Sequence, residues 1–220
     1  MLTRAQAIKQ GFVIDDGQRP VAYKGPRFSP TERHEVPTEL EEKLLVNNPS
    51  ARKARVIITF KCNRRCVNCC NTYKSIIDAG KHIRSITELA GYDQVILTGG
   101  EPMLFPDTVI GICEQLGKQG SEVFLYTALW VPQITTILKL VKGIHYTVHS
   151  PASDCDMIGF YKFQDLIKNR IGSYRLYIDP EVNRLITINP SVWSRVEIKP
   201  WLKEGECPLP IGEELFIIDP

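Results

Sequence analysis

The sequence has no apolar run of about 18 residues, the length that a helix needs to cross a bilayer. Its first stretch, MLTRAQAIKQ, lacks the apolar segment and the small-residue cleavage site of a secretory signal. Neither sign of charge dominates, because 27 lysines and arginines oppose 25 acidic residues. No segment repeats at a fixed period. These absences give no reason to expect a membrane or nucleic-acid partner, and we expect a cytoplasmic protein.

The chain of 220 residues, 43% of them hydrophobic, is long enough for one domain with a substantial core. Residues 1–54 differ from the rest because they are rich in proline and charge and poor in apolar runs. A capping box at Thr38 and Glu41 predicts a single short helix there, over Pro37–Val46. We interpret residues 1–54 as an N-terminal extension that acts as a lid, and residues 55–220 as the main domain.

From Arg55 onward, β-rich runs alternate with segments of helical periodicity. The predicted strands are Val56–Phe60, Gln94–Thr98, Glu122–Thr127, Ile144–His149, Tyr174–Ile178 and Arg195–Lys199. The predicted helices are Phe105–Gly117, Val131–Val141 and Gly159–Ile171, with a weaker crossover over Pro180–Trp193. Alternating strands and helices predict an α/β fold with parallel strands and right-handed crossovers.

Cysteine is the residue type that stands out. In a reducing cytoplasm the seven cysteines are poor disulfide candidates, and a cluster of them indicates metal ligands. Cys62, Cys66 and Cys69 follow the first predicted strand in a C-x3-C-x2-C spacing. Three thiolates on one loop suit an iron–sulfur cluster that keeps one iron open for a substrate. A structural zinc would require a fourth ligand, and Cys70 is too close to Cys69 to serve well.

This spacing resembles the signature of the radical S-adenosylmethionine (radical SAM) superfamily, in its single-cluster members. A second motif, Thr98-Gly99-Gly100-Glu101-Pro102, follows the second predicted strand and is similar to the family's Gly-Gly-Glu motif. The resemblance covers about residues 55–201. It implies a partial (β/α)6 radical-SAM barrel with an N-terminal extension.

The resemblance also implies an enzymatic reaction. A [4Fe–4S] cluster would cleave S-adenosyl-L-methionine reductively, and the resulting 5′-deoxyadenosyl radical would abstract hydrogen from a small-molecule or nucleobase-like substrate. An electron donor such as flavodoxin or ferredoxin would supply the electron. The protein would contribute placement and protection of the reacting groups.

Site residues follow from the same resemblance. The catalytic and metal-binding residues would be Cys62, Cys66 and Cys69. The cofactor-binding residues would be Asn68, Gly99, Gly100, Glu101, Thr127 and Ser150, and the substrate contacts would be His149 and Lys199. The family usually has an aromatic residue where Asn68 stands, and often Thr-Asn-Gly where this chain has Thr127-Ala128-Leu129.

Two other functions stay open at this stage. The chain could be an activating enzyme that generates a glycyl radical on a partner protein, or a non-catalytic iron–sulfur or zinc-binding module. Cys113 lies on the apolar face of its predicted helix, so we expect it in the core. No second cysteine cluster follows, which indicates one cluster only.

Overall fold

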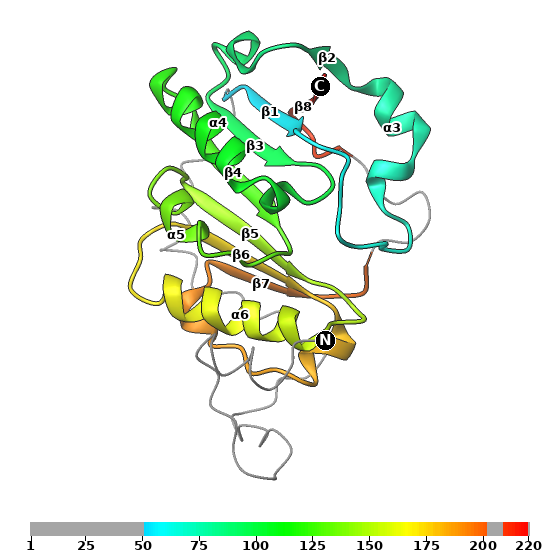
Figure 1. The fold of residues 1–220 in the computed structure, drawn as a ribbon, viewed down its shortest axis with the longest axis vertical. Coiled ribbons are helices and arrows are strands. Elements are labelled where there is room, and N and C mark those ends of the chain that lie inside the picture. The colour runs from blue at the N-terminus through cyan, green and yellow to red at the C-terminus, as the bar shows by residue number, and fades with distance from the viewer. Residues whose placement is uncertain (1–50, 202–208, 220) are drawn as a thin grey trace.

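The computed structural model describes residues 51–201 and 209–219. Its framework is one sheet of eight strands, all parallel, in the order β2-β8-β1-β3-β4-β5-β6-β7 (Figure 1). The strands are β1 (Lys53–Ile57), β2 (Lys81–Ile83), β3 (Gln94–Thr98), β4 (Glu122–Thr127), β5 (Gly143–Val148), β6 (Ser173–Ile178), β7 (Arg195–Ile198) and β8 (Glu213–Ile218). This confirms the expected α/β class with parallel strands, and adds β2 and β8 to the six predicted strands.

Short and long helices connect these strands. The α-helices are α3 (Lys74–Ala79), α4 (Pro106–Lys118), α5 (Ile134–Ile137), α6 (Asp154–Ile167) and α7 (Pro180–Asn183). The 3-10 helices are η1 (Cys70–Thr72), η2 (Ile86–Leu89), η3 (Pro102–Leu104) and η4 (Pro190–Val192). The predicted helix Val131–Val141 was too long, because only the four residues of α5 are α-helical. The predicted helix Pro37–Val46 lies outside the described residues.

The two faces of the sheet differ in what covers them. Helices α4, α5 and α6 lie along one face, and the main apolar core lies between them and the strands (Figure 1). Cys113 of α4 is 1% exposed in that core, as expected. On the opposite face, Ile76 and Ile77 of α3 pack against a smaller cluster at the β1–β8 end. Farther along this opposite face, the strands carry polar and charged side chains.

Local sequence explains where the longest helix starts. Ser153 precedes α6, and its hydroxyl oxygen accepts a hydrogen bond from the amide of Asp156 at 3.3 Å. The Asp156 carboxylate in turn accepts a hydrogen bond from the Ser153 amide at 2.8 Å. This capping box satisfies two amides that a helix start otherwise leaves unpaired. It also fixes Asp156 at the carboxyl-terminal edge of the sheet, where β5 ends.

No helix in the described part of the chain is long and apolar enough to span a membrane.

Candidate functional site

The two sequence motifs lie side by side at the carboxyl-terminal edge of the sheet. We call residues 58–73 the cysteine loop, which follows β1, and residues 99–101 the Gly-Gly-Glu turn, which follows β3. Because β1 and β3 are neighbours, their pairing continues past both strands. The amide of Gly100 donates to the carbonyl of Thr59 at 2.7 Å, and the amide of Glu101 donates to the carbonyl of Lys61 at 2.8 Å. The motifs are therefore joined through the main chain.

The two glycines are required by this close contact. Gly99 has φ of 132°, a conformation that side chains rarely adopt, and a Cβ there would collide with the Thr59 carbonyl oxygen. A Cβ on Gly100 would lie 2.6 Å from the carbonyl carbon of Lys61. From sequence we expected these glycines to let a bound cofactor approach. In the structure it is the cysteine loop that approaches them.

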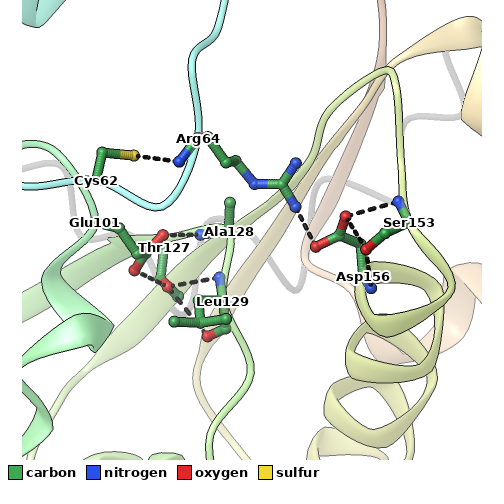
Figure 2. A network of polar contacts seen from close by, with 8 residues as sticks. All are labelled: Cys62, Arg64, Glu101, Thr127, Ala128, Leu129, Ser153 and Asp156. Carbon is green, nitrogen blue, oxygen red and sulfur yellow. Dashed lines mark hydrogen bonds and ion pairs between the residues drawn. The ribbon is translucent and has the colours of Figure 1, made fainter. Parts of the chain in front are cut away.

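Glu101 is a buried carboxylate that ties the turn to the end of β4. Its side chain accepts hydrogen bonds from the Thr127 hydroxyl at 2.6 Å and the Ala128 amide at 2.8 Å (Figure 2). It also accepts one from the Met103 amide at 2.9 Å. Only 2% of the residue is exposed. Burial raises the pKa of Glu101, and the three hydrogen bonds oppose that rise. Both carboxylate oxygens are already engaged, so Glu101 holds the turn in place.

Cys62, Cys66 and Cys69 are free thiols on the cysteine loop, with Cys62 exposed and the other two partly exposed. Partial burial raises the pKa of both Cys62 and Cys66, and the neighbouring Cys69 thiol raises them further. Thiolates on the same loop repel one another, and bound metal ions would offset that repulsion. Cys70 is disulfide-bonded, which corrects our expectation of reduced thiols throughout and agrees with leaving Cys70 out of the ligand set.

The loop conformation around these cysteines includes one unusual residue. Asn68 has φ of 58°, in the left-handed region that asparagine tolerates better than most residues, and so turns the chain immediately before Cys69. The Asn71 side-chain amide donates to the carbonyl of Gly99, which binds the loop to the turn a second time. Within residues 51–201 and 209–219, no group of three or more His, Cys, Asp or Glu side chains is close enough to hold a metal ion. The donor set fits an iron–sulfur cluster in its chemistry, as three thiols on one loop.

Arg64 connects the cysteine loop to α6. Its side chain runs from the loop past the ends of β4 and β5 and forms an ion pair with Asp156 (Figure 2). Both side chains are mostly buried, with 14% and 15% of their surface exposed. The Arg64 amide also donates to the Cys62 sulfur at 3.4 Å. Arg64 therefore anchors the segment between the first two cysteines.

Thr127 and Ser150 both follow strand ends, as the sequence suggested, but only Thr127 joins the motifs. The Thr127 hydroxyl is buried and donates to Glu101. Ser150 is exposed, and its hydroxyl donates to the Glu181 carboxylate of α7 at 2.7 Å. The structure thus brings together Glu101, Thr127 and the cysteine loop, with Ser150 turned to α7.

His149 and Lys199 have different surroundings. His149 is 9% exposed, and its ring meets the Trp201 ring edge to face with centroids 4.3 Å apart. Burial, and then the nearby Arg64 charge, lower the pKa of His149 to about 4. Its Nδ1 atom is buried without a hydrogen-bond partner. Lys199 is exposed and pairs with Glu197 at 2.8 Å.

No protein-family model matches this chain, and no curated protein is similar enough to count as a relative. The interpretation of the candidate site therefore rests on the residues of this chain alone. Sequence reasoning missed Arg64, Asn71 and Asp156. The Ser153-x-x-Asp156 pattern could have revealed the capping box, but no local signal pairs Arg64 with a residue 92 positions away.

Proposed function

We propose that the chain is a radical SAM enzyme that cleaves S-adenosyl-L-methionine reductively and uses the resulting radical to take hydrogen from a small-molecule substrate. The observation that carries this proposal is that the loop bearing three free thiols is hydrogen-bonded through its main chain to the Gly-Gly-Glu turn. An all-parallel sheet with α4, α5 and α6 along one face is compatible with the partial barrel of that superfamily. A [4Fe–4S] cluster, when bound, would supply the electron for cleavage.

Cys62, Cys66 and Cys69 would hold that cluster. The chain's own contribution is to fix the loop that carries them. Two main-chain hydrogen bonds and the Asn71 side chain hold the loop against the turn, and Arg64 holds its middle against α6. Glu101 keeps the turn rigid, because each of its oxygens has a buried donor. Rigid placement of this kind suits a reaction in which a reactive group must meet only one C–H bond.

The test is anaerobic. The full-length protein is reconstituted with iron and sulfide, reduced, and mixed with S-adenosyl-L-methionine, and 5′-deoxyadenosine is measured by mass spectrometry. A variant with Cys62→Ala, Cys66→Ala and Cys69→Ala should lose both iron and product. Cys155→Ala is the matched control, because Cys155 is also free and exposed but lies on α6.

Each result has a definite meaning. About four irons and four sulfides per chain, with product in wild type and Cys155→Ala only, supports the proposal. Iron without sulfide, or zinc, would favour a metal-binding module. A complete cluster that yields no 5′-deoxyadenosine and does not bind S-adenosyl-L-methionine would refute the radical assignment.

A further inference from the structure

The face of the sheet opposite α4, α5 and α6 carries a second group of polar side chains. Tyr126 of β4, His145 of β5 and Arg175 of β6 are consecutive partners across the sheet, so their side chains share one face. Arg55 of β1 lies over the Tyr126 ring, with its guanidinium carbon 4.8 Å from the ring centroid. We call these four residues, together with Glu197 of β7, the polar belt: Arg55, Tyr126, His145, Arg175 and Glu197. All five are partly buried.

His145 has unmet hydrogen-bonding capacity at the centre of this belt. Both of its ring nitrogens are shielded from solvent, and neither has a hydrogen-bond partner. Its ring meets the edge of Tyr126, with centroids 4.4 Å apart. Burial, and then the charge of Arg175, lower the pKa of His145 to about 4, so the ring is neutral at pH 7. A neutral imidazole offers one donor and one acceptor, and leaving both unused in a buried position is costly.

Charge is also unbalanced around His145. The charged groups that influence it are the cations Arg55, Arg175 and Lys199 and the single carboxylate Glu197. Arg55 is neutralised by Glu213 of β8 at 2.7 Å, with both side chains at most 15% exposed. Glu197 is contacted by Lys199 at 2.8 Å and by Arg195 at 3.1 Å.

Arg175 is the cation of the belt that has no such partner. Within the part of the chain that the structure describes, its guanidinium forms no ion pair and no side-chain hydrogen bond. Its guanidinium presents a planar set of donors that matches a carboxylate or a phosphate. Arg175 and Lys199 are long side chains, so an incoming ligand can displace them and reach the imidazole edge.

We propose that the polar belt binds a small molecule that bears a carboxylate or phosphate, with Arg175 pairing with the anion and His145 bonding to a neighbouring polar group. That this ligand is the substrate rests on the proposed function, whereas its binding does not. The belt includes residues of β4 and β5, whose carboxyl ends meet the Gly-Gly-Glu turn through Thr127 and the cysteine loop through the Arg64–Asp156 pair. A ligand held there would therefore extend toward the candidate site.

The experiment uses three probes of similar shape: benzoate, phenyl phosphate and neutral benzamide. They are titrated into full-length protein carrying ¹⁵N-labelled histidine, and the imidazole nitrogen signals of His145, assigned with His145→Gln, are followed by NMR. At least one anion should shift these signals saturably, and benzamide should bind about 10-fold more weakly, because a charge-assisted bidentate pair is lost. Tighter binding of benzoate would indicate a carboxylate ligand, and tighter binding of phenyl phosphate would indicate a phosphate ligand.

Two variants of Arg175 and one control test whether the anion binds at Arg175 itself or is attracted by positive charge in general. Arg175→Gln should weaken the anion about 10-fold or more, and Arg175→Lys by less, because Lys keeps the charge without the planar fork. Arg195→Gln is the matched control, since Arg195 opposes Arg175 on edge strand β7 and already pairs with Glu197. It should change affinity by less than about 3-fold. If Arg175→Gln unfolds, Arg175→Lys and the benzamide comparison still decide.

Failure of this proposal is distinct from failure of the proposed function. Benzamide binding as tightly as the anions, equal losses in Arg175→Gln and Arg195→Gln, or no shift of His145 by any probe would each overturn the belt as an anion site. The variant lacking Cys62, Cys66 and Cys69 should bind the anion as wild type does. If the anion binds but a complete cluster neither yields 5′-deoxyadenosine nor binds S-adenosyl-L-methionine, the belt stands and the radical assignment fails. If 5′-deoxyadenosine forms but no anion binds at His145, the radical assignment stands and the belt proposal fails.

Discussion

The Gly-Gly-Glu turn and the cysteine loop lie against each other but are built in different ways. The turn is buried, and Glu101 alone accepts three hydrogen bonds. The loop is only partly buried, and its three thiols are free, with the Arg64 amide donating to the Cys62 sulfur. The turn is therefore rigid by itself, whereas the loop depends on a few contacts at its ends and middle. We infer that the turn is the fixed reference against which the loop is placed.

The largest effect should come from removing the carboxylate that fixes the turn. Glu101→Ala would leave the Met103 and Ala128 amides without their acceptor, and the Thr127 hydroxyl with only the longer bond to the Leu129 carbonyl at 3.2 Å. Unpaired buried donors cost about 1–3 kcal/mol each, so unfolding free energy should fall by roughly 3–5 kcal/mol. Urea denaturation measures this loss. Thr127→Val removes one of the three donors to Glu101 and the acceptor of the Leu129 amide, and should cost about 1–2 kcal/mol. Equal losses in the two variants would contradict the role given to Glu101.

A methyl group at Gly100, where the Gly-Gly-Glu turn meets the cysteine loop, should push the two segments apart. In Gly100→Ala the new Cβ would meet the Lys61 carbonyl, and the backbone on one side must shift. We expect a loss of about 2–4 kcal/mol, together with lower iron content after reconstitution. Gly111→Ala is the control, because Gly111 lies within α4 and a Cβ there meets nothing within 4 Å. It should stabilise the protein by about 0.5–1 kcal/mol. A stable Gly100→Ala variant with full iron content would show that the contact is not needed.

Six of the strands in the described residues, edge strand β7 among them, could be predicted from sequence, whereas β2 and β8 could not. Glycines and polar residues mark the ends of β3 and β4, and their bounds agree with the prediction. Strand β1 starts three residues earlier than predicted, because Arg55 lies within it and pairs with Glu213 of β8. Strand β8 opens with two acidic residues, and β2 has only three residues, two of them exposed. Their pairing arises from tertiary contacts that a local pattern does not contain.

The same limit applies to the candidate site. That Cys62 and Glu101 would lie close together could be predicted, since both follow parallel strands that are neighbours in the sheet. The glycine requirement was interpreted as a ligand contact because a sequence does not show which chain approaches a turn. Arg64 and Asp156 form their pair across 92 residues. Only the folded arrangement of β1, β5 and α6 brings them together.

Removing the Arg64–Asp156 pair should increase the local motion of the cysteine loop and lower the unfolding free energy of the whole protein only modestly. Arg64→Met removes the partner of Asp156 and leaves a mostly buried carboxylate unpaired. The pair is neither fully buried nor exposed, so the loss should be about 1–3 kcal/mol. Amide hydrogen exchange should accelerate across residues 61–70 and stay unchanged across the Gly-Gly-Glu turn. Lys74→Met is the control: it removes an exposed pair with Asp78 and should cost less than about 0.5 kcal/mol. Faster exchange in the turn as well would mean that turn and loop move as one unit.

The smallest effect should be a pH dependence of the unfolding free energy that arises from His149, which lies near Arg64. Burial and the nearby Arg64 charge lower the pKa of His149 to about 4, below its value of about 6.5 in an unfolded chain. The unfolded chain therefore binds more protons than the folded protein between these values. His149 contributes stability above pH 6.5 that is lost as the pH falls toward 4, about 1–2 kcal/mol between pH 7 and pH 5. His149→Phe keeps an aromatic ring against Trp201 but cannot titrate, so urea denaturation should show a flatter pH profile. If the variant and the wild type have identical pH profiles, His149 is not the group that takes up the proton.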